Sequence, residues 1–593
     1  MSETSESLQI PGAFEGRPSR ARLQQSWRPR GPLGWTAILA ALILSAPILA
    51  VLLSLFSESE GAWRHLAESV LADYIANSLW LCLGVGGGVL IGGVSSAWLV
   101  TMCRFPLRKL FEWALILPLA VPAYVMAYAY TDFLAHHGPV QSLLRDVMGW
   151  GPREYWFPNI RSLEGAVLMF SLVLYPYVYL LSRAAFLEQS VCVLEVSRTL
   201  GQNAWGAFWR VALPLARPAI ITGMALALME TLADFGTVAH FGVPTFTTGI
   251  YRAWFSMGDR IAAAQLASLL LAFVLVLLLI EQLQRGRARY HQTSSRYQKL
   301  PRIRLQGAKA ALAIAVCALP LAFGFLLPMG ILLEMALSQG GNPFEGRYLT
   351  LIFNSVTLSG ITAAAAVAIA LLLAYATRLN PNRATLTANR IAAMGYALPG
   401  SIIAVGILIP LASLDNALDA WSERVFGLDL GLLFTGSIFA LVFAYLVRFM
   451  AISLKTVEAS LGKVTPNMDD AARTLGSGGL LTLLRVHAPI MRGSLLTAGL
   501  IVFVDVMKEL PATLIMRPFN FDTLAIQAYR FASDERLREA ATPALMIVAA
   551  GLLPVLLLSR SIRHSRPGQA KLPRNLFAEA GKEKAPLESG APL

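Results

Sequence analysis

Apolar segments of similar length follow one another along this chain, separated by shorter polar segments. Each approaches the ~20 residues that a helix needs to cross the hydrocarbon core of a membrane. The segments lie near residues 34–56, 77–101, 113–134, 164–183, 217–237 and 263–281, and then near 310–336, 353–377, 390–414, 431–454, 493–514 and 541–560. Pro118 and Pro122 interrupt the third segment, and Glu230 and Asp234 interrupt the fifth. The pattern predicts twelve membrane-spanning helices, six in each half of the chain.

Composition supports this prediction. Hydrophobic residues make up 56% of the 593 residues and charged residues only 14%, and the mean hydropathy is +0.58. So few charges cannot cover the surface of a soluble globule of this length. We therefore expect an all-α polytopic membrane protein.

Basic residues concentrate in alternate loops between the apolar segments. With the N-terminus in the cytoplasm, the cytoplasmic loops hold most Lys and Arg, including the run from Arg285 to Lys309. This asymmetry orients bacterial inner-membrane proteins and predicts that both termini are cytoplasmic. Topology and anionic membrane lipids then account for the net charge of +13. No soluble basic domain is long enough to indicate a nucleic-acid partner.

The polar segments divide the chain into five parts. No cleavage site of small residues follows the arginine-rich start, so we interpret the first apolar segment as a retained anchor. The predicted parts are an N-terminal tail at 1–33, a first half at 34–281, a linker at 282–308, a second half at 309–562 and a C-terminal tail at 563–593.

Two distant segments carry one signature. The first contains Glu195, Arg198, Thr199 and Gly201 and ends in Leu213-Pro214, and the second contains Asp470, Ala471, Ala472 and Gly476 and ends in Ala488-Pro489. The acid, the glycine and the proline are each 275 positions apart (470 − 195, 476 − 201, 489 − 214). A constant offset over this distance indicates a tandem duplication.

Each signature lies between the fourth and fifth predicted spans of its half, on the cytoplasmic side. A short helix precedes a glycine that permits a tight turn. A second amphipathic run follows and ends at the proline, which we expect to stop it ahead of the next span. The sequence thus predicts a protruding turn in each half.

No catalytic apparatus is found in the sequence. The Gly-Lys pairs at Gly462 and Gly581 lack the glycine frame of a phosphate-binding loop. Adjacent His136 and His137 are better interpreted as structural or solvated than as metal ligands. We expect no enzyme activity, no cofactor and no metal site.

The repeated signature resembles the EAA loop of permease subunits of binding-protein-dependent ABC importers. The first copy has Val196 and Ser197 where alanines are usual, and the second has Asp470 for Glu and Ala488 for Leu. The resemblance implies a type I importer fold in which each loop is a coupling helix, so that the chain seats two ATPase subunits. It also implies a periplasmic substrate-binding protein as partner.

One pair of acids lies in the fifth predicted span of each half. The first pair is Glu230 and Asp234. The positions 275 residues later are Asp505 and Glu509, and Lys508 lies beside this second pair. Spacing of four places each pair on one helix face. Two interpretations remain open. The acids line or gate a cation passage, as ionisable groups in a span often do, or they lie at the outer membrane edge and Lys508 neutralises a neighbour.

The sequence around these acids narrows the resemblance to particular permeases within this family. The stretch from Met229 to Ala239 and the stretch from Asp505 to Thr513 resemble the fused permeases of ferric iron importers. Thiamine permeases share the fused layout and are the alternative within the class. The resemblance implies alternating access powered by separate ATPases. A gradient-driven secondary transporter is the alternative from another class, and the paired cytoplasmic loops argue against it.

Overall fold

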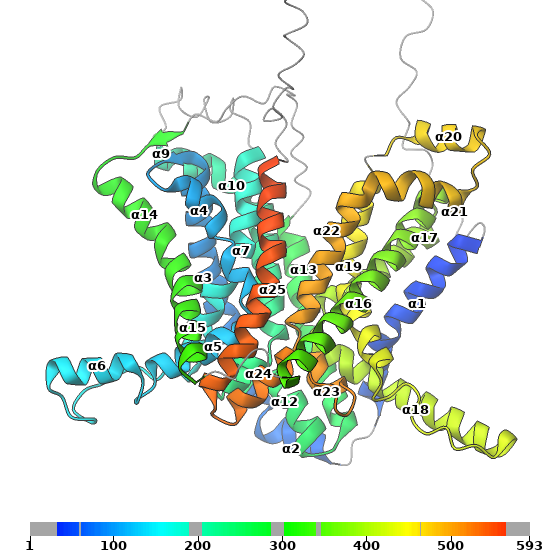
Figure 1. Cartoon of the computed structure of the whole chain (residues 1–593), viewed down its shortest axis with the longest axis horizontal. Helices are drawn as coiled ribbons and strands as arrows, with labels where there is room; N and C mark the ends of the chain where they lie inside the picture. The colour runs from blue at the N-terminus through cyan, green and yellow to red at the C-terminus, as the bar shows by residue number, and fades with distance from the viewer. Residues whose placement is uncertain are drawn as a thin grey trace, which may run out of the picture. The chain divides into compact units, whose positions relative to one another are not determined.

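The computed structural model describes residues 32–57, 61–188, 204–285, 302–339, 346–462 and 464–564. These residues are almost entirely helical (Figure 1). They fall into two compact units, and each unit collects segments from distant parts of the chain. Helices α13 (Arg260–Arg285) and α16 (Gly346–Leu379) are divided between the two units.

The first unit joins the start of the described chain to residues 253–268 and to the later part 353–521. Its elements are α1 (Pro32–Leu53), η1 (Ser54–Phe56), α17 (Arg383–Ala392), η6 (Met394–Ala397), α18 (Gly400–Phe426), α19 (Ile438–Leu461), α20 (Pro466–Thr474), α21 (Gly479–Thr482), η7 (Leu483–His487), α22 (Ala488–Met507) and α23 (Pro511–Met516). Helix α1 packs on α17 and α18. A Cβ on Gly406 of α18 would stand 2.4 Å from the Pro47 carbonyl oxygen, so this crossing requires glycine.

The second unit is built around α3 and α7. Its elements are α3 (Leu71–Met102), β1 (Cys103–Arg104), α4 (Arg108–Ala114), η2 (Leu117–Ala120), α5 (Ala123–Leu134), α6 (Pro139–Met148), α7 (Leu163–Glu188), α9 (Ala204–Ala207), η3 (Phe208–Ala212), α10 (Leu213–Ala233), α11 (Gly236–His240), α12 (Phe246–Tyr251), β2 (Ile303–Arg304), α14 (Ala308–Leu321), η5 (Ala322–Leu326), α15 (Leu327–Gln339), α24 (Leu524–Ser533) and α25 (Leu537–His564), with all but the first residue of α2 (Ala62–Ser69). Gly84 and Gly88 of α3 meet Val167 and Ser171 of α7 so closely that a Cβ would approach them within 2.8 and 2.1 Å. Small residues four apart permit such close helix packing in membranes.

The offset of 275 found in the sequence holds through the helices. Elements α9 and η3 map onto α21 and η7 without any shift of their ends. Further counterparts at this offset include α3 and α16, α4 and α17, α5 and α18, α7 and α19, α10 and α22, α11 and α23, and α13 and α25, while α14 maps back onto α1. The predicted duplication is therefore also a structural repeat.

Ten described helices are long and apolar enough to cross a membrane, or eleven if one bent pair counts as a span. These ten overlap ten of the predicted spans, and the span predicted at 541–560 lies within α25. The third predicted span is the bent pair, in which the chain turns by 92° between Ala120 and Ala123. Pro118 and Pro122 explain the break, since proline removes a helical hydrogen bond and disfavours helix before it.

The ninth predicted span, 390–414, begins later than expected. Its first residues form α17 and η6, and α18 starts at Gly400 after the extended Pro399. Hydrophobic periodicity could not locate this break because the residues on both sides of it are apolar.

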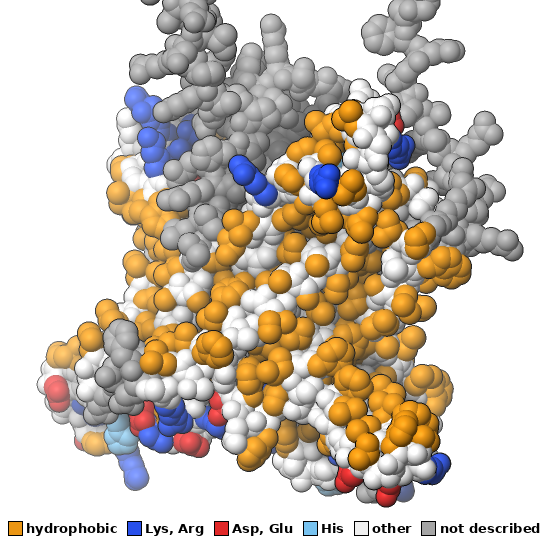
Figure 2. Space-filling view, turned by 45° about the vertical axis from the view of Figure 1, so that its right-hand side comes forward, with side chains coloured by type: hydrophobic (Ala, Val, Ile, Leu, Met, Phe, Trp, Pro, Cys, Tyr) orange, Lys and Arg blue, Asp and Glu red, His pale blue; other side chains and the backbone are white. Residues whose placement is uncertain are grey.

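Side chains on the visible face fit a membrane environment. Hydrophobic groups cover the helices, whereas Lys, Arg, Asp and Glu gather near their ends (Figure 2). Individual apolar side chains are widely exposed, among them Ile91 at 72% and Phe353 at 70%. Lipid tails rather than water are the natural surroundings of such residues.

Candidate functional site

The second signature forms a helix that ends in a left-handed glycine. Just after α20, Gly476 has φ +78° and its N–H donates to the Arg473 carbonyl at 3.0 Å. The N–H of Ser477 donates to the Ala472 carbonyl at 2.9 Å. This pair of bonds is the Schellman motif, in which the residue with positive φ is usually glycine. The tight turn predicted at Gly476 is confirmed.

The surface of this turn mixes an apolar tip with charges. Leu475, next to the glycine, is 85% exposed. The side chains of Asp470 and Arg473 are 70% and 64% exposed and lie 3.5 Å apart. Ala472 faces inward and is buried. The turn therefore exposes one apolar side chain, with a charged pair on the helix that precedes it.

One arginine braces the helix of the second signature. Arg378, at the end of α16, contacts Asp469 of α20 at 2.7 Å and donates to the Leu461 carbonyl at 2.7 Å and the Val464 carbonyl at 2.9 Å. His487 approaches the other Asp469 oxygen at 2.7 Å and is fully buried. The planar guanidinium can hold several acceptors at once, so the end of α16, the end of α19 and α20 are joined.

The proline of the signature does not stop a helix. Pro214 and Pro489 lie in the first turn of α10 and α22, directly after the π-helical turns η3 and η7. The helix continues into the next span, contrary to our expectation. Because the helix continues from the π-helical turn, the missing N–H of each proline leaves one helical hydrogen bond unmade at this junction.

The first signature lies mostly outside the described residues. This holds for Glu195, Arg198, Thr199 and Gly201, while Leu213 and Pro214 belong to α10. The roles of these residues remain predictions.

The spacing predicted that the two acids of each pair share one face of a continuous helix. The structure differs from this prediction. Helix α10 ends at Ala233 and α22 ends at Met507, so a helix end separates the two acids of each pair. Asp234 instead accepts hydrogen bonds from the N–H groups of Thr237, at 2.8 Å, and Val238, at 3.4 Å. Its carboxylate caps α11, which follows the break.

Glu509 makes the same contacts in the second repeat. It accepts from the N–H groups of Ala512 at 2.9 Å and Thr513 at 3.0 Å, which are positions 237 and 238 plus 275. In addition, Arg448 of α19 lies 3.0 Å from Glu509, and both side chains are buried. The counterpart of Arg448 in the first half is Val173 (448 − 275). The repeat therefore conserves the cap but not the ion pair.

Lys508 pairs with the other acid of its repeat. Its amine lies 2.9 Å from Asp505, with the two side chains 27% and 19% exposed. The interpretation that Lys508 neutralises a neighbour thus applies to Asp505, and Arg448 is the partner of Glu509. Arg448 was not among the predicted site residues, although a single arginine within the apolar segment 431–454 is a signal for an intramembrane ion pair.

A polar cavity of about 390 Å³ in the second unit was also missed. Arg161 and Glu535 form two parallel hydrogen bonds at its edge, of 2.9 and 2.7 Å, and these bonds lower the pKa of Glu535. Burial lowers the pKa of His240 to about 4. The ring of His240 lies edge-on to that of Tyr128, with 4.9 Å between centroids. These residues come from segments far apart in sequence, so no local motif marks them.

Comparison with known proteins gives a consistent picture. Residues 84–289 match the family described as binding-protein-dependent transport system inner membrane component. Over 90% of its length the chain is 25% identical to the Fe(3+)-transport system permease protein FbpB 2 of Haemophilus influenzae, of which it covers 99%. It is 23% identical to the ferric transport system permease protein FbpB of Actinobacillus pleuropneumoniae, over 82% of this chain and 70% of that protein.

A second kind of relative matches a shorter part. The molybdenum transport system permease protein ModB of Escherichia coli is 31% identical over 196 residues, which is 32% of this chain and 82% of that protein. The sequence similarity to ferric permeases, by contrast, extends over both repeats.

Proposed function

This chain belongs to the family of binding-protein-dependent transport system inner membrane components, and we propose that its cargo is ferric iron. It is a multi-pass inner-membrane permease, a transport subunit rather than an enzyme. The observation that carries the choice of cargo is the similarity to an Fe(3+)-transport permease over 90% of this chain and 99% of that protein. A periplasmic binding protein would deliver the iron.

Energy for transport would come from two ATPase subunits that dock on the signature turns. The rigid turn at Gly476 and the 85% exposed Leu475 support this assignment in the second repeat. Arg378 joins that turn to α16 and α19. A displacement of α20 by a docked ATPase would therefore be transmitted directly to these two helices. The first signature would act in the same way, with both termini in the cytoplasm.

Transport would follow alternating access. ATP must bind the state with closed ATPases more tightly than the open state, because only a difference in affinity shifts a conformational equilibrium. Docking turns would transmit closure to the two repeats. Asp234 and Glu509 then serve to hold the break after the fifth span, and Glu230 and Asp505 are the better candidates for contact with a cation in the passage.

Reconstitution tests the proposal. We would place the permease and its ATPase in liposomes, supply the cognate binding protein, and measure uptake of labelled ferric iron, molybdate, sulfate and thiamine. ATP-dependent uptake of iron alone is expected, and a non-hydrolysable ATP analogue should abolish it. Uptake of another solute without iron would overturn the assignment of cargo while leaving the permease assignment intact.

A further inference from the structure

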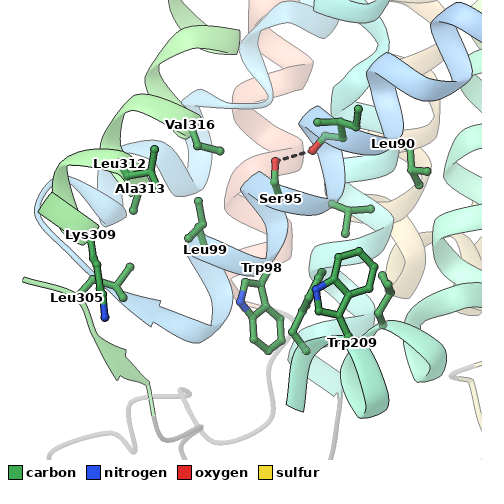
Figure 3. Close-up of a pocket in the computed structure, with 14 residues that line it drawn as sticks. Leu90, Ser95, Trp98, Leu99, Trp209, Leu305, Lys309, Leu312, Ala313 and Val316 are labelled. Carbon is green, nitrogen blue, oxygen red and sulfur yellow. Dashed lines mark hydrogen bonds between the residues drawn. The ribbon is translucent and has the colours of Figure 1, made fainter. Parts of the chain in front are cut away.

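An apolar groove lies in the second unit between α3, α14 and the start of α10 (Figure 3). Its volume is about 600 Å³, within the ~300–1,000 Å³ usual for small-molecule sites. Its walls are almost entirely hydrocarbon. The wall residues include Leu90 and Ile91 of α3, Leu312 and Val316 of α14, and Trp209 of η3.

The groove is held open by contacts at both ends of α14. Residues Cys103 and Arg104 pair with Ile303 and Arg304 as parallel strands, which fixes the chain entering α14 beside the end of α3. Beyond α14, a Cβ on Gly324 of η5 would stand 2.6 Å from the Leu172 carbonyl oxygen, so η5 is in close contact with α7. Helix α14 also contacts α3 itself, so the groove lies between two helices whose relative position is fixed.

The walls of the groove are well suited to a hydrocarbon chain. Ile91 is 72% exposed and Leu312 66% exposed, although both face this concave surface. Ser95 has its hydroxyl hydrogen-bonded to the Ile91 carbonyl, so it presents no free donor to an occupant (Figure 3). Water in such a site would find no partners, and apolar sites of this kind take apolar ligands.

One end of the groove is basic. Lys309 lines it and is exposed, next to Leu305 (Figure 3). Arg104 and Arg304, paired in the short sheet, are exposed at the same end. An apolar groove with cations at one mouth has the charge pattern of a phospholipid site, with hydrocarbon along the groove and phosphate at the amine.

We propose that this groove binds one acyl chain of an anionic phospholipid, whose phosphate contacts Lys309. The lipid would bridge α14 to Phe208 and Trp209, which lie just ahead of Pro214 in the first repeat. A bound lipid thus contacts the segment that joins the first signature to its span. This proposal does not depend on the cargo.

The test measures lipid retention. We would reconstitute the full chain in vesicles of phosphatidylcholine with phosphatidylglycerol, extract it in mild detergent, and count retained phosphatidylglycerol by native mass spectrometry. Lys309→Gln should lower retention about fivefold, the equivalent of the ~1 kcal/mol typical of one basic residue near a membrane surface. Val316→Trp should block the groove and abolish retention of phosphatidylglycerol.

Two controls separate the site from general charge. Lys309→Arg keeps the cation and should retain the lipid, and so should Lys109→Gln, which removes an exposed lysine of α4 that does not line the groove. Equal phosphatidylglycerol retention by wild type, Lys309→Gln and Val316→Trp would overturn the proposal. The proposal would also be overturned if a protein segment, rather than a lipid, occupied the groove. If Val316→Trp fails to fold, the comparison of Lys309→Gln with Lys309→Arg still tests the proposal.

Discussion

The guanidinium of Arg448 lies 3.0 Å from the carboxylate of Glu509, and both side chains are buried. Glu509 also accepts hydrogen bonds from the Ala512 and Thr513 N–H groups. Gly400, at the start of α18, permits this arrangement because a Cβ there would stand 2.4 Å from Arg448. Three elements thus meet at one ion pair where the fifth span of the second repeat breaks.

Removing one partner of this pair should destabilise the protein strongly. Arg448→Met leaves the Glu509 charge buried and unpaired, which costs about 3–5 kcal/mol in comparable cases. Thermal unfolding in detergent should show a clear loss for Arg448→Met and a smaller one for Arg448→Met with Glu509→Gln. Identical midpoints for wild type and Arg448→Met would contradict a structural role for the pair.

Neutralising the acids that do not cap a helix should slow transport. We expect Glu230→Gln and Asp505→Asn to lower iron uptake while expression and ATPase copurification stay unchanged, because the substitutions remove charge and keep shape. Lys508→Met should cost at most ~1 kcal/mol of stability, as expected of a partly exposed pair.

Asp234→Asn and Glu509→Gln should affect protein stability as well as transport, unlike Glu230→Gln and Asp505→Asn. They weaken a capping carboxylate, so protein levels should fall along with uptake. Wild-type uptake in all four acid variants, at matched membrane levels, would leave the acids without a role in the passage.

The turn at Gly476 should be sensitive to conformation rather than to size. A Cβ there would meet no neighbour within 4 Å, yet φ is +78°, a region that costs a residue such as valine roughly 1–2 kcal/mol. Gly476→Val should therefore reduce ATPase copurification and transport, whereas Gly476→Asn, which tolerates this region, should retain both. Gly201→Val tests the first copy. Normal transport in both valine variants would remove the coupling assignment.

The two signatures should tolerate proline loss unequally. We expect Pro214→Ala to lower binding-protein-stimulated ATP hydrolysis more than Pro489→Ala does. The second copy is braced by Arg378 and Asp469, whose counterparts in the first half are Cys103 and Leu194 (378 − 275, 469 − 275). Adding Arg378→Met to Pro489→Ala should erase the difference. Equal and negligible effects of both single substitutions would count against the prediction.

Acid should destabilise the second unit through His240. Burial lowers its pKa to about 4 from an ordinary value near 6.5, so the folded state binds fewer protons than the unfolded state between these values. Stability should therefore fall as pH drops through this window, by on the order of 1 kcal/mol per pH unit. Arg161 and Glu535 line the same cavity as His240.

The measurement is the unfolding midpoint between pH 7 and pH 4. His240→Gln should flatten the dependence above about pH 5. His65→Gln, which alters an exposed histidine of α2, should not. Glu535 contributes in the same direction but at lower pH, because its pKa is lowered by Arg161 and protonation breaks the pair. A pH profile unchanged by His240→Gln would disprove the assignment.

The sequence by itself determined the membrane class, the helical content, the duplication and the tight turn at Gly476. These depend on signals that local chemistry imposes, namely apolar length, a glycine that permits positive φ and a fixed offset between copies. The same offset of 275 later aligned η3 with η7 and the cap at Asp234 with that at Glu509.

Only the tertiary structure decided which residues pair. Arg378 with Asp469, Arg448 with Glu509 and Arg161 with Glu535 join positions 91, 61 and 374 apart in sequence. No periodicity encodes such contacts, because they arise when helices pack and buried charges must find partners. The break between Glu230 and Asp234 escaped prediction for a related reason. A carboxylate that caps a new helix and one that continues an old helix have the same spacing in sequence, and only the backbone distinguishes them.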